Sequence, residues 1–301
     1  SESLRRPFES PMNLRRLNHA RAWRFFNTGG GGSIDLNCSH KGMRVLVLAS
    51  GGKDSAYSTW WSTLRGWDIS GLVTIRVTGG DSMMFQVPTT ALAGMQAASA
   101  DIPWLPVAIE GNEETEMQLL ENALESIVHG SGKSRSDIWS NDEINETIWP
   151  DGWKWPSNLR RLRSSSAIQG LVVGAIRSDY QKTRIEQMCA RLNLRSFTPL
   201  WHHDGNAHMR ELVSHGHQIM ITSVSTEGLG EEWVGRILSH SDVSELEDLA
   251  KKHRFNVDGE GGEFETAVLD APWMKSAIKT QHTIHWTGRR GWVDIWGAEL
   301  V

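Results

Sequence analysis

Short apolar runs alternate with amphipathic stretches along the chain from Met43 to about residue 200. Mainly apolar runs of this length are typical of strands buried on both faces of a parallel sheet. They predict strands at 44–49, 71–77, 104–109, 169–175 and 196–200. Helices are predicted at 55–65, 89–100, 113–128 and from Ser178 onward. This alternation predicts an α/β fold, a doubly wound parallel five-stranded sheet.

The pattern changes after residue 200. The elements predicted there are a helix near 207–214, a strand at 218–224, helices at 231–239 and 243–252, and a hairpin of 283–286 with 292–296. This mixture indicates a smaller C-terminal α+β domain, residues 201–301, which we expect to bind the substrate.

Two segments lie outside this pattern. Residues 1–42 are rich in arginine and contain four consecutive glycines at 29–32, which predicts a flexible basic extension outside the fold, with a transit peptide as the alternative. Residues 130–164 are polar but carry four tryptophans. Such an insertion either binds a partner or is an ordered excursion whose tryptophans pack on their own domain, and we favour the second.

Composition and charge exclude several functional classes. With 39% hydrophobic and 22% charged residues, and no apolar run near the ~20 residues of a membrane span, the chain predicts a globular protein without a membrane partner. The two cysteines, Cys38 and Cys189, have no metal-binding spacing, which favours a cytoplasmic setting. Seven of the 31 basic and three of the 36 acidic residues lie in 1–42, so the rest carries a net charge of −9. That balance disfavours direct nucleic-acid binding.

The clearest chemical motif is Ser50-Gly51-Gly52-Lys53-Asp54-Ser55, between the first strand and the first helix. Glycines let the backbone approach a phosphate, and the free amides at a helix start favour an anion. Lys53 adds positive charge, and two serine hydroxyls can donate to phosphate oxygens. The loop is not a Walker A motif, which would need a glycine in place of Val47 and Ser or Thr in place of Asp54. The alternative is a glycine turn with a solvated lysine.

This hexapeptide resembles the SGGxDS signature of the PP-loop ATP pyrophosphatases, which have a HUP-like α/β fold. The resemblance implies that residues 43–200 are an ATP-binding domain, with ATP and Mg²⁺ as its cofactors. In that superfamily the loop holds the departing pyrophosphate, and ATP is cleaved between its α and β phosphates to give an adenylated substrate.

A second helix start follows the fourth predicted strand. If the sheet order is 3-2-1-4-5, Ser178 and Asp179 lie near the first loop and can bind magnesium or the nucleotide, while Arg184 can reach phosphate. The alternative is that they only cap and solvate the helix. The residues expected to bind ATP are Ser50, Gly51, Gly52, Lys53, Asp54, Ser55, Arg76, Gly174, Ser178, Asp179 and Arg184.

Four further stretches narrow the resemblance to the diphthine–ammonia ligase family. They are Pro199-Leu200-Trp201, Glu227-Gly228-Leu229, the run from Gly259 to Thr266, and the run from Val268 to Pro272. The resemblance extends from about Met43 to about Lys275 and is interrupted by 130–164. It implies a ligase that converts diphthine on translation elongation factor 2 into diphthamide with ATP and ammonium, through an acyl-adenylate, with release of AMP and pyrophosphate.

The resemblance also implies the site residues. Lys53, Asp54, Glu260 and Glu263 are the expected catalytic residues. The expected substrate-binding residues are Tyr180, Gln181, Glu227, Glu260, Gly261, Gly262, Glu263, Phe264, Glu265 and Thr266. Carboxylates beside an aromatic ring suit the trimethylammonium group of diphthine, and one of the glutamates can accept a proton. The alternative is a solvated acidic turn.

Other features leave alternatives open. Trp201-His202-His203-Asp204, with His208, has no defined metal spacing, so we expect a solvated loop and no metal site. Gln86 stands where the family usually has histidine, which puts an acid–base role at that position in doubt. The competing functions are another PP-loop adenylating enzyme that acts on tRNA, and a regulator that binds ATP without turnover.

Overall fold

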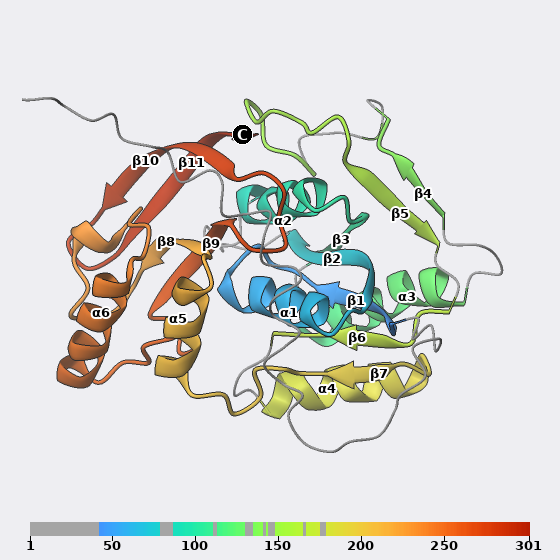
Figure 1. Cartoon of the computed structure of the whole chain (residues 1–301), viewed down its shortest axis with the longest axis horizontal. Coiled ribbons are helices and arrows are strands. Elements are labelled where there is room, and N and C mark those ends of the chain that lie inside the picture. The colour runs from blue at the N-terminus through green and yellow to red at the C-terminus, as the bar shows by residue number, and fades with distance from the viewer. Residues whose placement is uncertain are drawn as a thin grey trace, which may run out of the picture. The chain divides into compact units, whose positions relative to one another are not determined.

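A seven-stranded sheet forms the first half of the protein in the computed structural model, which describes residues 42–78, 87–110, 113–129, 135–140, 143, 148–164, 167–174 and 179–301 (Figure 1). Its strands are β1 (Arg44–Leu48), β2 (Asp68–Thr78), β3 (Trp104–Glu110), β4 (Arg135–Ile138), β5 (Arg160–Ser164), β6 (Gly170–Val172) and β7 (Arg195–Phe197). Their order is β4-β5-β3-β2-β1-β6-β7. The stretch β3-β2-β1-β6-β7 is parallel throughout, which confirms the predicted sheet and its 3-2-1-4-5 order.

The expected number of five strands was too low. Strand β5 pairs in parallel with β3, and β4 pairs antiparallel with β5, so the insertion extends the sheet at one edge. Strand β5 reads Arg-Arg-Leu-Arg-Ser, and only Leu162 among these residues is buried. A strand of this composition lacks the apolar signal by which the other strands were recognised.

Alternate side chains of β1 pack into two separate cores, one on each face of the sheet. Val45 and Val47 pack in the core beneath α1 (Lys53–Leu64) and α2 (Val87–Ser99), whereas Leu46 faces the core beneath α3 (Glu113–Val128) and α4 (Asp179–Arg191). The sheet is therefore covered by helices on both faces, as its unbroken apolar strands predicted.

The tryptophans of the insertion pack on their own protein. Trp139, Trp149 and Trp153 are at most 6% exposed, and Trp139 and Trp149 both contact the ring of Trp104 on β3. The Nε1 of Trp153 donates to the carbonyl of Ile295, 3.1 Å away. The favoured interpretation, packing on their own domain, is confirmed for Trp139 and Trp149, whereas Trp153 bonds to a residue of the C-terminal part.

The C-terminal part contains α5 (Gly205–Ser214), β8 (Gln218–Val224), η3 (Glu231–Trp233), α6 (His240–His253), β9 (Phe264–Asp270), β10 (Ile278–Trp286) and β11 (Gly291–Leu300). Its four strands form an antiparallel sheet in the order β10-β11-β8-β9. Helix α5, strand β8 and the hairpin were predicted. Helix 231–239 was not correct, because Gly235 adopts φ +79° and the chain then runs beside β8, where Leu238 N–H donates to the Ile219 carbonyl at 2.8 Å.

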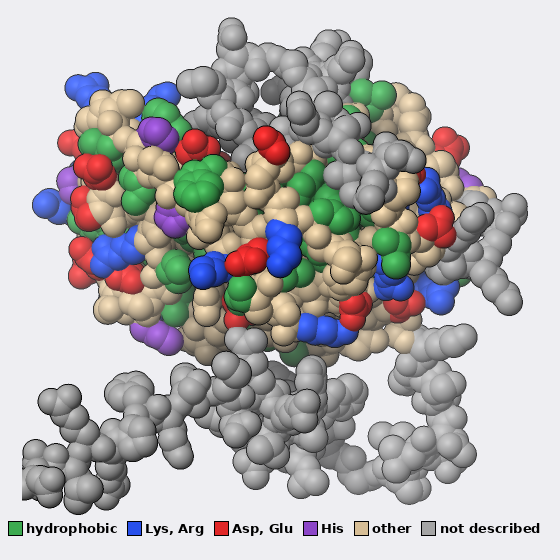
Figure 2. Space-filling view, turned by 90° about the horizontal axis from the view of Figure 1, so that it is seen from above, with side chains coloured by type: hydrophobic (Ala, Val, Ile, Leu, Met, Phe, Trp, Pro, Cys, Tyr) green, Lys and Arg blue, Asp and Glu red, His purple; other side chains and the backbone are tan. Residues whose placement is uncertain are grey.

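The apolar core is continuous between the two sheets. One cluster of buried side chains includes Val45 on β1, Leu92 on α2, Val268 on β9 and Ala298 on β11. The domain boundaries given above stay predictions, and residues 1–41 lie outside the described part. Within that part, no helix is long and apolar enough to cross a membrane. On the part of the surface that Figure 2 shows in colour, Lys and Arg side chains are interspersed with Asp and Glu side chains.

His217, in the turn between α5 and β8, makes stability depend on pH. Burial lowers its pKa to about 4, although its Nδ1–H donates to the Leu212 carbonyl at 3.1 Å. The unfolded chain therefore takes up a proton between pH 6.5 and 4 that the folded chain resists, and stability falls as the pH falls through that window. We expect His217 to contribute up to about 3 kcal/mol to this loss.

Urea unfolding at pH 7 and pH 4 measures the effect. His217→Gln cannot titrate, so its free energy of unfolding should fall less between these two pH values than that of the natural chain. Equal losses in both proteins would show that His217 is not the group responsible.

Candidate active site

The motif Ser50–Ser55 forms the turn between β1 and α1. Gly51 has φ +89°, a conformation that an L side chain would strain. Gly52 is the N-cap of α1 and provides no side-chain cap. The hydroxyl of Ser50 accepts from Gly52 N–H at 3.3 Å, and that of Ser55 donates to the Gly52 carbonyl at 3.0 Å. The geometry is a helix start whose positive end is not covered by a capping carboxylate.

Strand β9 of the C-terminal sheet fixes this loop from the other side. The hydroxyl of Thr266 accepts from Lys53 N–H at 3.2 Å, and Val268 N–H donates to the Gly51 carbonyl at 3.0 Å. Gln96 on α2 donates both to that carbonyl and to the Val268 carbonyl, at 2.9 and 2.7 Å. The loop and the strand that follows the glycine–glutamate run are thereby joined into one site.

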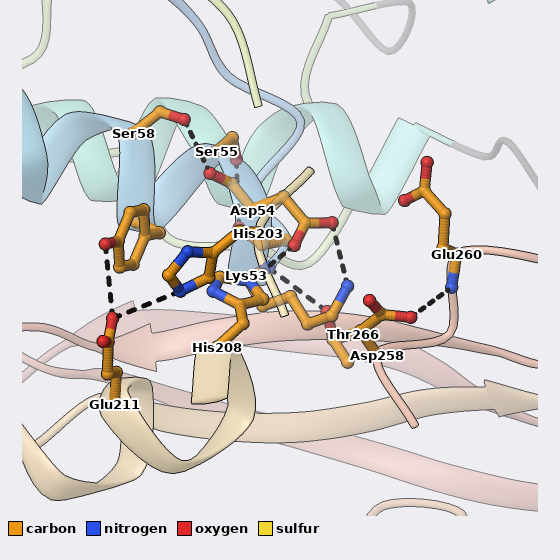
Figure 3. A network of polar contacts seen from close by, with 12 residues as sticks. Lys53, Asp54, Ser55, Ser58, His203, His208, Glu211, Asp258, Glu260 and Thr266 are labelled. Carbon is orange, nitrogen blue, oxygen red and sulfur yellow. Dashed lines mark hydrogen bonds and ion pairs between the residues drawn. The ribbon is translucent and has the colours of Figure 1, made fainter. Parts of the chain in front are cut away.

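A chain of polar side chains lies at the first turn of α1 (Figure 3). The Lys53 side chain is buried, and its Nζ lies 2.8 Å from Oδ2 of Asp54. The other oxygen of Asp54, Oδ1, lies 2.8 Å from Nε2 of His208. Burial alone would raise the pKa of Asp54, but the Lys53 ammonium and the His208 hydrogen bond outweigh it, so the pKa is lowered. Asp54 is therefore ionised near neutral pH.

The expectation of a solvated loop was wrong for His208. This residue lies on α5, is 1% exposed and shares a buried face with Met209 and Leu212. Its position four residues before Leu212 was the available signal, because residues at that spacing share a helix face. Nothing in the sequence indicated that Asp54, 154 residues away, would be its partner.

The run from Gly259 to Thr266 forms a turn that leads into β9. The carboxylate of Glu263 accepts from both the backbone and the side chain of Asn256 at 2.8 Å and from Gly261 N–H at 2.7 Å. Phe264 is 3% exposed. In this structure Glu263 therefore holds the turn, and Phe264 belongs to the core.

The other two acids of this run are Glu265, which is exposed, and Glu260. Glu265 is open to water on one side, yet the protein around it is dense enough to raise its pKa, an effect opposed by Lys53 and reinforced by Asp54. Glu265 therefore shares the electrostatic environment of the loop. Glu260 is half-buried, and its N–H donates to Asp258 at 3.3 Å.

Three more of the predicted residues are Gly174, Arg76 and Tyr180. Gly174, just after β6, abuts the loop, since a Cβ there would lie 2.8 Å from the carbonyl carbon of Asp54. Arg76 is half-buried near the end of β2, and desolvation lowers its pKa. Tyr180 is 62% exposed on α4, where its hydroxyl accepts from Arg184 at 2.6 Å.

Other predicted residues lie at the surface or outside the described part. Asp179 is exposed at the start of α4, and Glu227 is exposed in the loop after β8. Ser178, Gln86 and the side chain of Gln181 are among the residues that are not described. The structure thus brings Lys53, Asp54, Gly174 and Thr266 together and leaves the other assignments as predictions.

Comparison with known proteins agrees with this arrangement. A family model described as the diphthamide synthase N-terminal domain matches residues 43–143, and one described as the diphthamide synthase C-terminal domain matches residues 204–301. The two matches contain the loop and the strand that fixes it.

Relatives named diphthine–ammonia ligase align over most of the chain. The protein from Homo sapiens is 30% identical over 244 residues, which cover 78% of this chain and 82% of the relative. The protein from Danio rerio is 30% identical over 81% of this chain and 89% of the relative. The relative from Schizosaccharomyces pombe is 29% identical over 78% of this chain, which spans only 36% of that longer protein. This chain therefore belongs to the diphthamide synthase family.

Proposed function

We propose that this protein amidates diphthine on translation elongation factor 2 with ammonium in an ATP-dependent reaction that gives diphthamide, AMP and pyrophosphate. Three relatives that cover most of the chain carry the name diphthine–ammonia ligase, which supports the substrate. The cytoplasm, where this factor acts in translation, is the expected location.

The observation that carries the proposal is the junction of the loop with β9. A helix start without an N-cap side chain, a buried lysine and a hydroxyl from the C-terminal sheet meet at Lys53. Gly51 and Gly52 carry no side chains at the centre of the loop. A Cβ on Gly52 would lie 3.2 Å from the carbonyl oxygen of Thr266, so there is little room for a larger residue. A narrow, positively polarised cradle of this kind suits a polyphosphate. The loop is expected to hold the departing pyrophosphate of ATP.

ATP supplies the leaving group, since a carboxylate becomes reactive toward ammonia once it is adenylated. The chain's own residues then have distinct roles. Lys53 and the first amides of α1 would stabilise negative charge on the phosphates. Arg76 and Arg184 are further cations for the nucleotide, and Mg²⁺ is expected to accompany its phosphates. Asp54 holds the ammonium of Lys53.

The acidic run is the proposed diphthine side of the site. Glu265 is accessible and has a raised pKa, which suits a group that accepts a proton from ammonium. Glu260 and Glu227 are further carboxylates for the trimethylammonium cation. Glu263 supports this surface by holding the turn, and Phe264 supports it by packing in the core. Both would contribute to binding indirectly.

The test is to supply ATP, Mg²⁺, ammonium and diphthine-bearing elongation factor 2 and to measure AMP, pyrophosphate and the mass of the factor. The proposal expects one AMP for each carboxylate converted to an amide, and no AMP when the factor is omitted. ATP binding without AMP formation would reject this substrate. AMP formation with tRNA instead would favour the alternative adenylating enzyme, and binding without turnover on either substrate would favour the regulator.

A further inference from the structure

His208 is bonded to the loop in an arrangement that packing alone does not favour. Its Nε2 lies 2.8 Å from Oδ1 of Asp54, and its side chain is 1% exposed. The other ring nitrogen, Nδ1, is buried and has no hydrogen-bond partner in the described part of the chain. A buried polar atom without a partner is destabilising, so packing alone gives no reason for a histidine on this face of α5.

The surroundings of Nδ1 offer it little compensation. The ring of Tyr57 meets the imidazole edge-on with 5.1 Å between centroids, and the ring of His203 is 5.9 Å away. The hydroxyl of Tyr57 is directed elsewhere, to Glu211 at 3.3 Å. The histidine therefore has one strong polar contact, the one with Asp54.

The contact with His208 determines how the Asp54 carboxylate is oriented toward the Lys53 ammonium. Each oxygen of the carboxylate has its own partner, Oδ1 with His208 and Oδ2 with the Lys53 ammonium (Figure 3). With Oδ1 held by α5, the carboxylate cannot turn to engage the ammonium with both oxygens. Among the residues that the structure describes, the Lys53 ammonium thus has one acceptor, Oδ2 of Asp54, which leaves N–H groups for a bound phosphate.

We propose that His208 is a positioning residue: it holds Asp54 so that the Lys53 ammonium stays directed at the phosphates of a bound nucleotide. This inference rests on the proposed function, because it assigns the loop to ATP. It adds a residue from α5 to the nucleotide site, besides the contacts that Thr266 and Val268 on β9 make with the loop.

Calorimetric titration with a non-hydrolysable ATP analogue and Mg²⁺ tests the proposal on the full chain. His208→Leu removes the hydrogen bond and puts an apolar side chain of similar size in its place. Binding of the analogue should weaken by about tenfold or more. His208→Gln keeps a donor at a similar reach, and it should stay within about threefold of the natural chain. The melting temperature of the leucine variant should stay close to that of the natural chain, because removing the unpartnered Nδ1 offsets the loss of the hydrogen bond to Asp54.

A double-mutant cycle with Asp54→Asn separates positioning from other effects. If His208 acts through Asp54, adding His208→Leu to Asp54→Asn should change the affinity by less than about twofold. Independent losses in the double variant would overturn the proposal, as would unchanged binding by His208→Leu. A leucine variant with a much lower melting temperature, not rescued by glutamine, would show a purely structural role. A natural chain that binds no nucleotide would reject the proposed function itself and this inference with it.

Discussion

Replacing Lys53 by alanine is expected to reduce the rate of AMP formation by about 10³-fold at saturating substrate. The ammonium is the buried cation at the start of α1, and negative charge grows on the departing pyrophosphate as the α–β bond of ATP breaks. Stabilisation of charge that develops in the transition state affects the rate more than the binding of ATP. We therefore expect a fall in kcat well above any rise in the KM for ATP, measured by AMP release over a range of ATP concentrations.

A second substitution separates charge from packing. Lys53→Met keeps the length and most of the volume of the buried chain but removes the ammonium, so it should be as slow as the alanine variant. Lys251 on α6 is the matched control, because its side chain is 76% exposed, and Lys251→Ala should change the rate by less than about twofold. A methionine variant with more than about a tenth of the natural rate would contradict a charge role for Lys53.

The parallel sheet and the loop were predictable because their signals are local. Each strand buried on both faces is a mainly apolar run, and the loop combines glycines with a strand before it and a helix after it. Strand β5 was missed for the opposite reason. None of its arginines is buried, and Arg161 pairs with Glu143 at 2.6 Å. This ion pair joins two residues of a polar segment in which no strand pattern is visible.

The contacts that complete the site could not be predicted because they join distant parts of the chain. Gln96 is a polar residue inside the apolar helix α2, and its two acceptors are on Gly51 and Val268. His208 lies in the same way inside the apolar face of α5. A buried polar side chain implies a partner, but which group this is depends on how the two sheets pack, and the sequence does not contain that information in any local form.

The acidic run shows the limit of inference from resemblance. Its glutamates were all assigned to the substrate, since their spacing does not distinguish them. In the structure, Glu263 accepts three hydrogen bonds from its own turn, whereas Glu265 is accessible and electrostatically linked to Lys53. Residues that alternate along a strand point to opposite sides, but Glu263 precedes β9, so its direction follows from the turn and not from that alternation.

Gly174→Ala is expected to lower AMP formation by about 10²-fold and to destabilise the fold by about 1–3 kcal/mol. A Cβ at this position would lie 2.8 Å from the carbonyl carbon and 2.9 Å from the carbonyl oxygen of Asp54. These are backbone atoms at the first turn of α1 and cannot turn aside as a side-chain end can. The chain after β6 and the start of α1 must separate, which moves Lys53 and Asp54 away from Thr266.

The matched control for Gly174 is Gly230, which has ordinary extended backbone at the start of η3. A Cβ on Gly230 would also overlap a neighbour, but that neighbour is the end of the exposed Glu232 side chain, which can move away. Gly230→Ala should therefore keep the natural rate and melting temperature. Rates measured well below the melting temperature of Gly174→Ala separate misplacement from unfolding. If Gly174→Ala is destabilised but keeps the natural rate in its folded state, the prediction is wrong. The contact between the end of β6 and the loop would then support the fold without setting the geometry of the loop.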